Sequence, residues 1–292
     1  MIKINNIDLA SMGIILLRGG DNDIFSFPER KDPPQNDWFE QNGLDVDLSE
    51  SFFNARKIAL KFRLKAISTI DFDSKMEAFE SLLFSSGNKS VYFSIYNLTL
   101  QLRFISISNF RFVGKLSQAG NKIAEFTCDF CEDAPLEMFT DDLEPSEGII
   151  VNNRLKINNY EFSYFGVVVN KIYDTALTTN SPKGVLERTF VRYSGQIADS
   201  ECVAAKKAKN ITIQCRLNWI SISAFIVNWS SLFNQLNLYH SVNFPNGIEI
   251  LINESKLLKC YYKSMSVSRV HYKNGSISID FSINLINHVI GE

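Results

Sequence analysis

The chain has 292 residues, of which 45% are hydrophobic and 21% are charged, and these proportions exclude a disordered chain. Its 14 Gly and 7 Pro are too few for a collagen-like or linker-rich protein, and its net charge of −2 gives no overall reason to bind nucleic acid or an anionic membrane. The length predicts two domains, and the 23 Phe and 10 Tyr favour strands.

The first predicted elements are two strands that a turn at Asn5-Asn6 separates. The apolar run Ile14–Leu17 that follows is too short for a signal-peptide core or a membrane span. We therefore expect the chain to begin at Met1 and to stay in the compartment where it is made. The 5 cysteines form no even framework, which is typical of reduced intracellular thiols.

A loop with Pro28, Pro33 and Pro34 comes next, and an extended stretch follows at Asp45–Asp47. From Lys57 to Lys65, apolar and charged residues then alternate strictly. Period-two alternation of this kind predicts a strand with one buried face.

One helix is predicted after this strand, with Asp71 or Asp73 as its cap. Its apolar stripe is interpreted as core packing rather than as a ligand box: Phe72, Met76, Phe79, Leu82 and Leu83. Strands are predicted at 91–95, 99–107 and 124–130. The Cys128-x-x-Cys131 spacing lies at the end of the last strand and has no second pair, so it predicts two strand cysteines, one of them buried, rather than a metal site.

The segment 129–147 contains eight acidic residues and no Lys or Arg. With Pro135 and Pro145 it reads as a solvated linker. A divalent-cation site is the sharper alternative, but no Asp-x-Asp-x-Asp-Gly loop is present.

The chain nearly repeats itself on either side of this linker. Lys3-Ile4-Asn5-Asn6 recurs as Lys156-Ile157-Asn158-Asn159, and Gly13 matches Gly166 at the same offset of 153. Arg63-Leu64 matches Arg216-Leu217, and a second apolar helix stripe follows: Phe225, Trp229, Leu232, Phe233 and Leu236. An ordered series of matches predicts a duplicated domain. The predicted boundaries are 1–140 for copy 1, 141–152 for the linker and 153–292 for copy 2.

Each copy combines alternating strands with one helix, and Asn274-Gly275 is the strongest hairpin signal. The predicted fold class is therefore mainly β (α+β), with two tandem related β-sandwich or barrel domains, each with one flanking helix.

The familiar catalytic patterns are missing from the sequence. His240, His271 and His288 lie in copy 2 without metal-ligand spacing, and His271 is interpreted as an exposed strand residue. Asp45 and Asp47 form a carboxylate pair that copy 2 does not repeat, so they are interpreted as solvated. We predict no catalytic, cofactor-binding or metal-binding residues, no cofactor and no enzymatic activity.

A binding module remains the alternative function, because β-sandwiches often carry glycans on aromatic platforms. The candidate residues are four tyrosines: Tyr92, Tyr96, Tyr261 and Tyr262. Such residues more often pack the sheet. A carbohydrate- or protein-binding β-sandwich is therefore the second hypothesis.

The charge is divided unequally between the copies. Residues 1–150 hold 15 basic and 23 acidic residues, a net charge of −8, whereas residues 151–292 hold 15 and 9, a net charge of +6. Head-to-tail association would place the acidic copy of one chain on the basic copy of the next. Neutral drift after duplication is the other interpretation.

The order of these features resembles the distal tail proteins of long-tailed bacteriophages and, more broadly, tail-tube-like domains. The resemblance covers nearly all of copy 1: the Asn-Asn turn before Gly13-Ile14-Ile15, the loop Pro28–Pro34, Asn42-Gly43-Leu44-Asp45, the strand 55–62, the helix 73–84, and Phe126–Phe130 before Ala134-Pro135. It implies a tube-like fold and a ring around a DNA channel at the junction of tail tube and host-recognition tip. No catalytic residues follow from it.

The resemblance also carries expectations about partners and location. It implies a virion tail or baseplate protein that resides in the cytoplasm during assembly, contacts other tail proteins, meets DNA only by passage through the channel and binds no membrane. Copy 2 departs from the family, because a different, galectin-like second domain is expected there. Three chains with two tube-like domains each would form a pseudo-sixfold trimer, and a hexamer with two stacked rings is the rival arrangement.

Overall fold

A computed structural model describes residues 1–113, 120–136, 139, 155–158, 160–173, 176–184, 187–189, 196–198, 205–237, 247–252 and 256–289. The predicted linker 141–152 lies outside these residues. Within them, no helix has the length and apolarity needed to span a membrane.

Copy 1 is built on a seven-stranded antiparallel sheet in the order β2-β1-β7-β8-β9-β6-β3. Its elements are β1 (Ile2–Ile4), β2 (Ile7–Asp8), η1 (Leu9–Met12), β3 (Ile14–Leu16), η2 (Asn22–Phe25), β4 (Gln35–Asn36), β5 (Asp45–Val46), β6 (Arg56–Ala66), α1 (Thr69–Phe84), β7 (Lys89–Phe93), β8 (Leu98–Phe112) and β9 (Lys122–Glu132). The short strands β4 and β5 pair with each other outside the main sheet.

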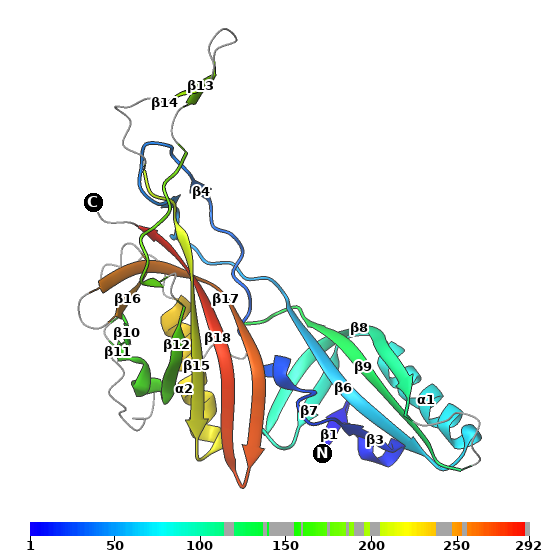
Figure 1. Ribbon diagram of the computed structural model, residues 1–292. Helices are drawn as coiled ribbons and strands as arrows, with labels where there is room; N and C mark the ends of the chain where they lie inside the picture. The colour runs from blue at the N-terminus through cyan, green and yellow to red at the C-terminus, as the bar shows by residue number, and fades with distance from the viewer. Residues whose placement is uncertain are drawn as a thin grey trace.

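Copy 2 repeats this sheet strand for strand in the order β11-β10-β16-β17-β18-β15-β12. Its elements are β10 (Leu155–Ile157), β11 (Tyr160–Glu161), η4 (Phe162–Phe165), β12 (Val167–Ile172), β13 (Glu187–Thr189), β14 (Gln196–Ala198), β15 (Lys209–Trp219), α2 (Ile222–Asn237), β16 (Ile248–Ile252), β17 (Lys256–Lys273) and β18 (Ser276–Val289). The structure therefore confirms two tandem, related, mainly-β domains with one helix each, and Figure 1 shows them side by side.

The strongest sequence patterns formed the predicted elements. The alternation around Lys57–Lys65 became β6, in which every second residue is buried. Asn274 and Gly275 both have positive φ and join β17 to β18, as a two-residue hairpin requires.

The cap predicted for the first helix is wrong. Ser68, rather than Asp71 or Asp73, is the N-cap of α1, and its hydroxyl accepts the backbone N–H of Asp71. Asp71 lies in the first turn, where its carboxylate accepts the N–H of Ile67 and pairs with Lys75. The Ser68 hydroxyl and the Asp71 carboxylate thus satisfy the backbone N–H groups of Asp71 and Ile67, so the cap begins earlier than a lone aspartate suggests.

Gly13 and Gly166 end the 3-10 helices η1 and η4 in the same left-handed conformation, each with φ of 72°. A Cβ on Gly13 would lie 2.5 Å from the carbonyl oxygen of Lys65, and one on Gly166 would lie 2.7 Å from the Trp219 ring. Both the conformation and the space therefore require glycine.

We expect G13A to destabilise the protein more than G275A does. Both substitutions pay about 1–2 kcal/mol for a left-handed alanine, but the Cβ on Gly275 meets nothing within 4 Å, whereas the one on Gly13 clashes with backbone. Urea unfolding of the two variants measures the difference. Equal losses would show that the close approach at Gly13 relaxes without cost.

Candidate functional site

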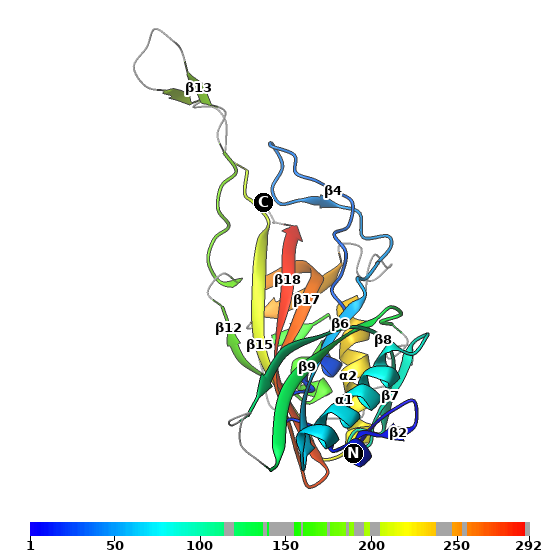
Figure 2. The same cartoon turned by 90° about the vertical axis from the view of Figure 1, so that its right-hand side faces the viewer.

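The structure joins the two copies through a segment that we name arm 1, residues 18–55, which leaves the sheet of copy 1 after β3 and returns at β6. Its equivalent in copy 2 is arm 2, residues 173–208, between β12 and β15. Arm 1 crosses copy 2, whereas the hairpin of β13 and β14 in arm 2 extends away from both sheets (Figure 1, Figure 2).

Aromatic side chains of arm 1 pack onto helix α2. The Phe25 ring lies 5.1 Å from that of Phe225, and the Phe27 ring lies 4.5 Å from that of Trp229. Trp229 is 1% exposed, and its indole N–H donates to the carbonyl oxygen of Phe25 at 3.1 Å. Phe53, at the end of arm 1, lies 5.6 Å from Phe233. Arm 1 is therefore part of the core of copy 2.

Polar contacts extend this joint along β17. The Tyr262 hydroxyl donates to the carbonyl oxygen of Pro28 at 3.0 Å, and the N–H of Arg30 donates to the carbonyl oxygen of Lys263 at 2.9 Å. The Lys263 ammonium lies 2.7 Å from Asp32 and 3.7 Å from Glu29. Acidic residues of copy 1 thus meet a basic residue of copy 2 inside one chain.

Helices α1 and α2 differ in burial because, among the described residues, an arm covers only α2. Both have 16 residues, but α2 buries eight of them and α1 buries three: Phe72, Phe79 and Leu83. Beyond the buried stripe, Phe84 on α1 is 71% exposed and Ile105 on β8 is 48% exposed. In the part of the chain that the structure describes, no segment covers the face of copy 1 that is equivalent to the one covered by arm 1 on copy 2.

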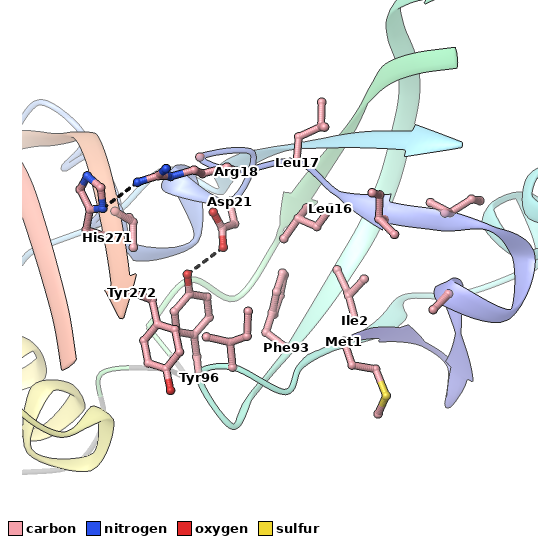
Figure 3. A pocket seen from close by; sticks show the side chains of 16 residues that line it. Met1, Ile2, Leu16, Leu17, Arg18, Asp21, Phe93, Tyr96, His271 and Tyr272 are labelled. Carbon is pink, nitrogen blue, oxygen red and sulfur yellow. Dashed lines mark hydrogen bonds between the residues drawn. The ribbon is translucent and has the colours of Figure 1, made fainter. Parts of the chain in front are cut away.

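A cavity of about 490 Å³ lies at the seam between the copies. Apolar residues of β1, β3 and β7 line it, together with Val270, His271 and Tyr272 of β17 (Figure 3). The Arg18 guanidinium lies 3.3 Å from His271 Nδ1 at one side, and the Tyr96 hydroxyl donates to Asp21 at 2.8 Å. Cross-copy side chains therefore enclose one buried carboxyl group.

Burial raises the pKa of Asp21 above its usual value, and the hydrogen bond from Tyr96 opposes this shift. Burial, together with the Asp21 charge, also raises the pKa of Tyr96. A carboxyl with a raised folded-state pKa stabilises the fold most below its unfolded pKa of 3.8, and that contribution is lost as the pH rises through the folded value.

We expect D21N to stabilise the protein at neutral pH, because the amide oxygen can still accept from Tyr96 while the buried charge is removed. The advantage over the wild type should shrink as the pH falls through the raised folded-state pKa of Asp21 and should be lost below 3.8. Thermal unfolding between neutral and acidic pH measures it. An advantage that grows on acidification would contradict the raised pKa.

The sequence-predicted residues do not form one site. Cys128 and Cys131 both lie in β9 as predicted, but both are buried, so the prediction that one would be buried is wrong. His271 is exposed on β17, as interpreted from the sequence; His288 is buried in β18; and His240 lies outside the described residues. Asp45 and Asp47 are exposed on arm 1.

The proposed tyrosine platform is also absent at these four positions. Tyr261 and Tyr262 are buried in β17, Tyr96 is buried in the turn between β7 and β8, and Tyr92 is half-buried with its hydroxyl on Asn97. In the described part of the chain, no three His, Cys, Asp or Glu side chains gather closely enough to hold a metal ion. The absence of a metal site or cofactor stays a prediction from the sequence.

The residues that join the copies were missed at the sequence level. Phe25, Phe27 and Phe53 lie in a loop that was interpreted only through its prolines and acidic residues. The signal in the sequence is their apolar character, since three phenylalanines in an otherwise polar loop need a surface to cover them.

Comparisons with known proteins give a weak structural likeness and no match at the level of sequence families. No family model matches the chain, and no curated protein matches it. The crystal structure of the SPP1 Dit (gp 19.1) protein, described as a paradigm of the hub adsorption apparatus in phages that infect Gram-positive bacteria, is similar with a TM-score of 0.35 and 10% identity. The match covers 99% of this chain and 98% of that one. The likeness is weak, and the function proposed next rests on the duplicated fold and its contacts.

Proposed function

We propose that the protein is a non-enzymatic structural component of a phage or prophage tail or baseplate, and that it forms a ring at the end of the tail tube by self-association. The observation that carries the proposal is the joint between the copies, where two related domains pack as neighbours through arm 1. Such a joint is the intrachain form of a subunit contact. The sequence resemblance of copy 1 to distal tail proteins supplies the setting.

The proposed ring is a trimer with pseudo-sixfold symmetry. A head-to-tail contact forms a closed ring when the rotation between neighbouring subunits adds up to a full turn. Three chains with two copies each would supply six domains to such a ring. The contacts between Lys263 and Asp32 and between Lys183 and Asp37 already pair basic copy 2 with acidic copy 1, which favours alternation of the copies around the ring. DNA would only pass through the channel, and other tail or baseplate proteins would contact the ring.

The mass of the purified protein in solution tests this proposal. A ring of three 33.2 kDa chains has a mass of about 100 kDa, whereas a hexamer that forms two stacked rings would have twice that mass. We expect the trimer by light scattering coupled to size exclusion. A mass of 33.2 kDa at every concentration would contradict self-association.

A further inference from the structure

The face of copy 1 that lacks an arm is the starting observation. We name it the α1 face and define it by Met76, Glu80, Phe84, Phe104 and Ile105, on α1 and β8. The equivalent residues of copy 2 are Trp229, Phe233, Asn237, Tyr262 and Lys263. Arm 1 contacts every one of these five. Within the described residues, no arm lies on the α1 face.

The structure fixes this equivalence independently of sequence matching. Helices α1 and α2 have the same length, which places Glu80 at the position of Phe233 and Phe84 at that of Asn237. Bulges interrupt β8 and β17 at the same point and leave Ile105 and Lys263 as the extra residues. The two faces can therefore be compared residue by residue.

The two arms are equivalent in the same way. In arm 1, the backbone N–H of Asn54 donates to the carbonyl oxygen of Glu29, and that of Lys31 donates to the carbonyl oxygen of Phe52. In arm 2, the backbone N–H of Lys207 donates to the carbonyl oxygen of Ser181, and that of Lys183 donates to the carbonyl oxygen of Ala205. Isolated bridges join Arg30 to Phe53 and Pro182 to Lys206. Lys206 therefore holds the position of Phe53.

The residues of arm 2 and of the α1 face differ from their counterparts in the intrachain joint in a compatible way. The aromatic pair Phe53–Phe233 of the intrachain joint corresponds to Lys206 and Glu80, which carry opposite charges. Lys206 and Glu80 would face each other only if arm 2 lies on the α1 face. Their opposite charges would then replace the aromatic contact with another favourable pairing.

A second group of positions changes in the same compatible manner. Lys263, which pairs with Glu29 and Asp32, corresponds to the apolar Ile105. On arm 2 both acidic partners are gone as well, because Ser181 and Gly184 hold their positions. The loss of a cation on one surface thus matches the loss of two anions on the other.

We propose that residues 181–184 and 205–207 of arm 2 of one chain dock on the α1 face of a second copy of this chain, as the equivalent residues of arm 1 dock on copy 2 within the chain. Arm 2 and α1 lie at opposite ends of the molecule, so a chain cannot make this contact with itself (Figure 1). The contact is open-ended and heterologous, which suits a ring. It rests on the proposed self-association and names the surfaces that carry it.

The docking differs from the intrachain joint in one respect. Pro182 holds the position of Arg30 and has no N–H, so the backbone hydrogen bond from Arg30 to Lys263 has no equivalent. Side chains must carry this part of the contact, which makes the Lys206–Glu80 pair the sharpest point to test.

Charge reversal tests the pairing. E80K and K206E each place like charges together, and we expect each to weaken self-association about tenfold, the effect of about 1.4 kcal/mol. The double variant E80K/K206E should restore it, because opposite charges then meet at every contact. An equimolar mixture of the two single variants should restore it only in part, because a ring of three chains cannot alternate the two variants and keeps at least one like-charge contact. Sedimentation equilibrium measures all four samples.

K207E is the matched control, because Lys207 is the exposed neighbour of Lys206 on the same arm strand. It should leave self-association unchanged, and circular dichroism should show that every variant is folded. An oligomeric wild type whose association is indifferent to E80K and K206E would overturn the docking while leaving the proposed function intact. A wild type that is monomeric throughout would overturn both.

Discussion

Replacement of Arg56 with alanine is expected to lower the free energy of unfolding by about 3–5 kcal/mol, because it leaves a buried carboxylate without its partner. The Arg56 side chain is 3% exposed, and its Nε lies 2.6 Å from Glu132. Its Nη1 also donates to the carbonyl oxygens of Ile24 and Ser26 at 2.9 and 2.7 Å. Arg56 therefore holds the start of arm 1 against β9.

Two comparisons separate the buried charge from the loss of an ion pair as such. R103A removes the bidentate ion pair between Arg103 and Asp133. These side chains are 54% and 45% exposed, so the variant should lower the free energy of unfolding by at most about 1 kcal/mol. The double variant R56M/E132M removes both charges and should recover much of the loss. Urea unfolding measures each variant. A loss for R56A as small as that for R103A would contradict the role of burial.

Replacement of Trp229 with alanine is expected to cost about 3–5 kcal/mol, the range for a large buried aromatic residue. The indole packs against Phe27, and against Phe281 at 4.9 Å, and it donates to the Phe25 carbonyl. Because these partners belong to both copies, the variant should also uncouple them. We expect the wild type to unfold in a single transition and W229A to unfold in two.

Met76 offers the matched control, because it holds the position of Trp229 in copy 1, where no arm covers it in the described residues. M76A should cost less than W229A and leave the transition single. The comparison uses far-UV circular dichroism in urea, with W229F as a variant that keeps a ring but loses the hydrogen bond, at a cost of about 1 kcal/mol. One cooperative transition for W229A would show that the copies do not depend on this joint.

Local patterns were enough to predict the elements of the fold. The alternation in β6 needs only the contrast between one buried and one exposed face, and the turns at Asn5-Asn6 and Asn274-Gly275 need only residues that tolerate positive φ. The duplication is visible because copy 1 has Gly13 and copy 2 has Gly166 at the equivalent position, where no other residue fits. Each of these signals lies within a few residues.

The joint between the copies could not be predicted in this way. Phe25 and Trp229 are 204 positions apart, and nothing near either residue indicates the other. The unequal charge of the copies nevertheless indicates that acidic residues of copy 1 contact basic residues of copy 2. The pairs Lys263–Asp32 and Lys183–Asp37 show where part of that inequality is used.

Single-particle imaging of the purified protein tests the central claim most directly. The account predicts a ring of three chains with six similar domains around a channel, in which arm 2 of each chain lies on α1 of the next. Isolated two-domain particles, or a ring in which α1 faces solvent and arm 2 contacts no neighbouring chain, would contradict it.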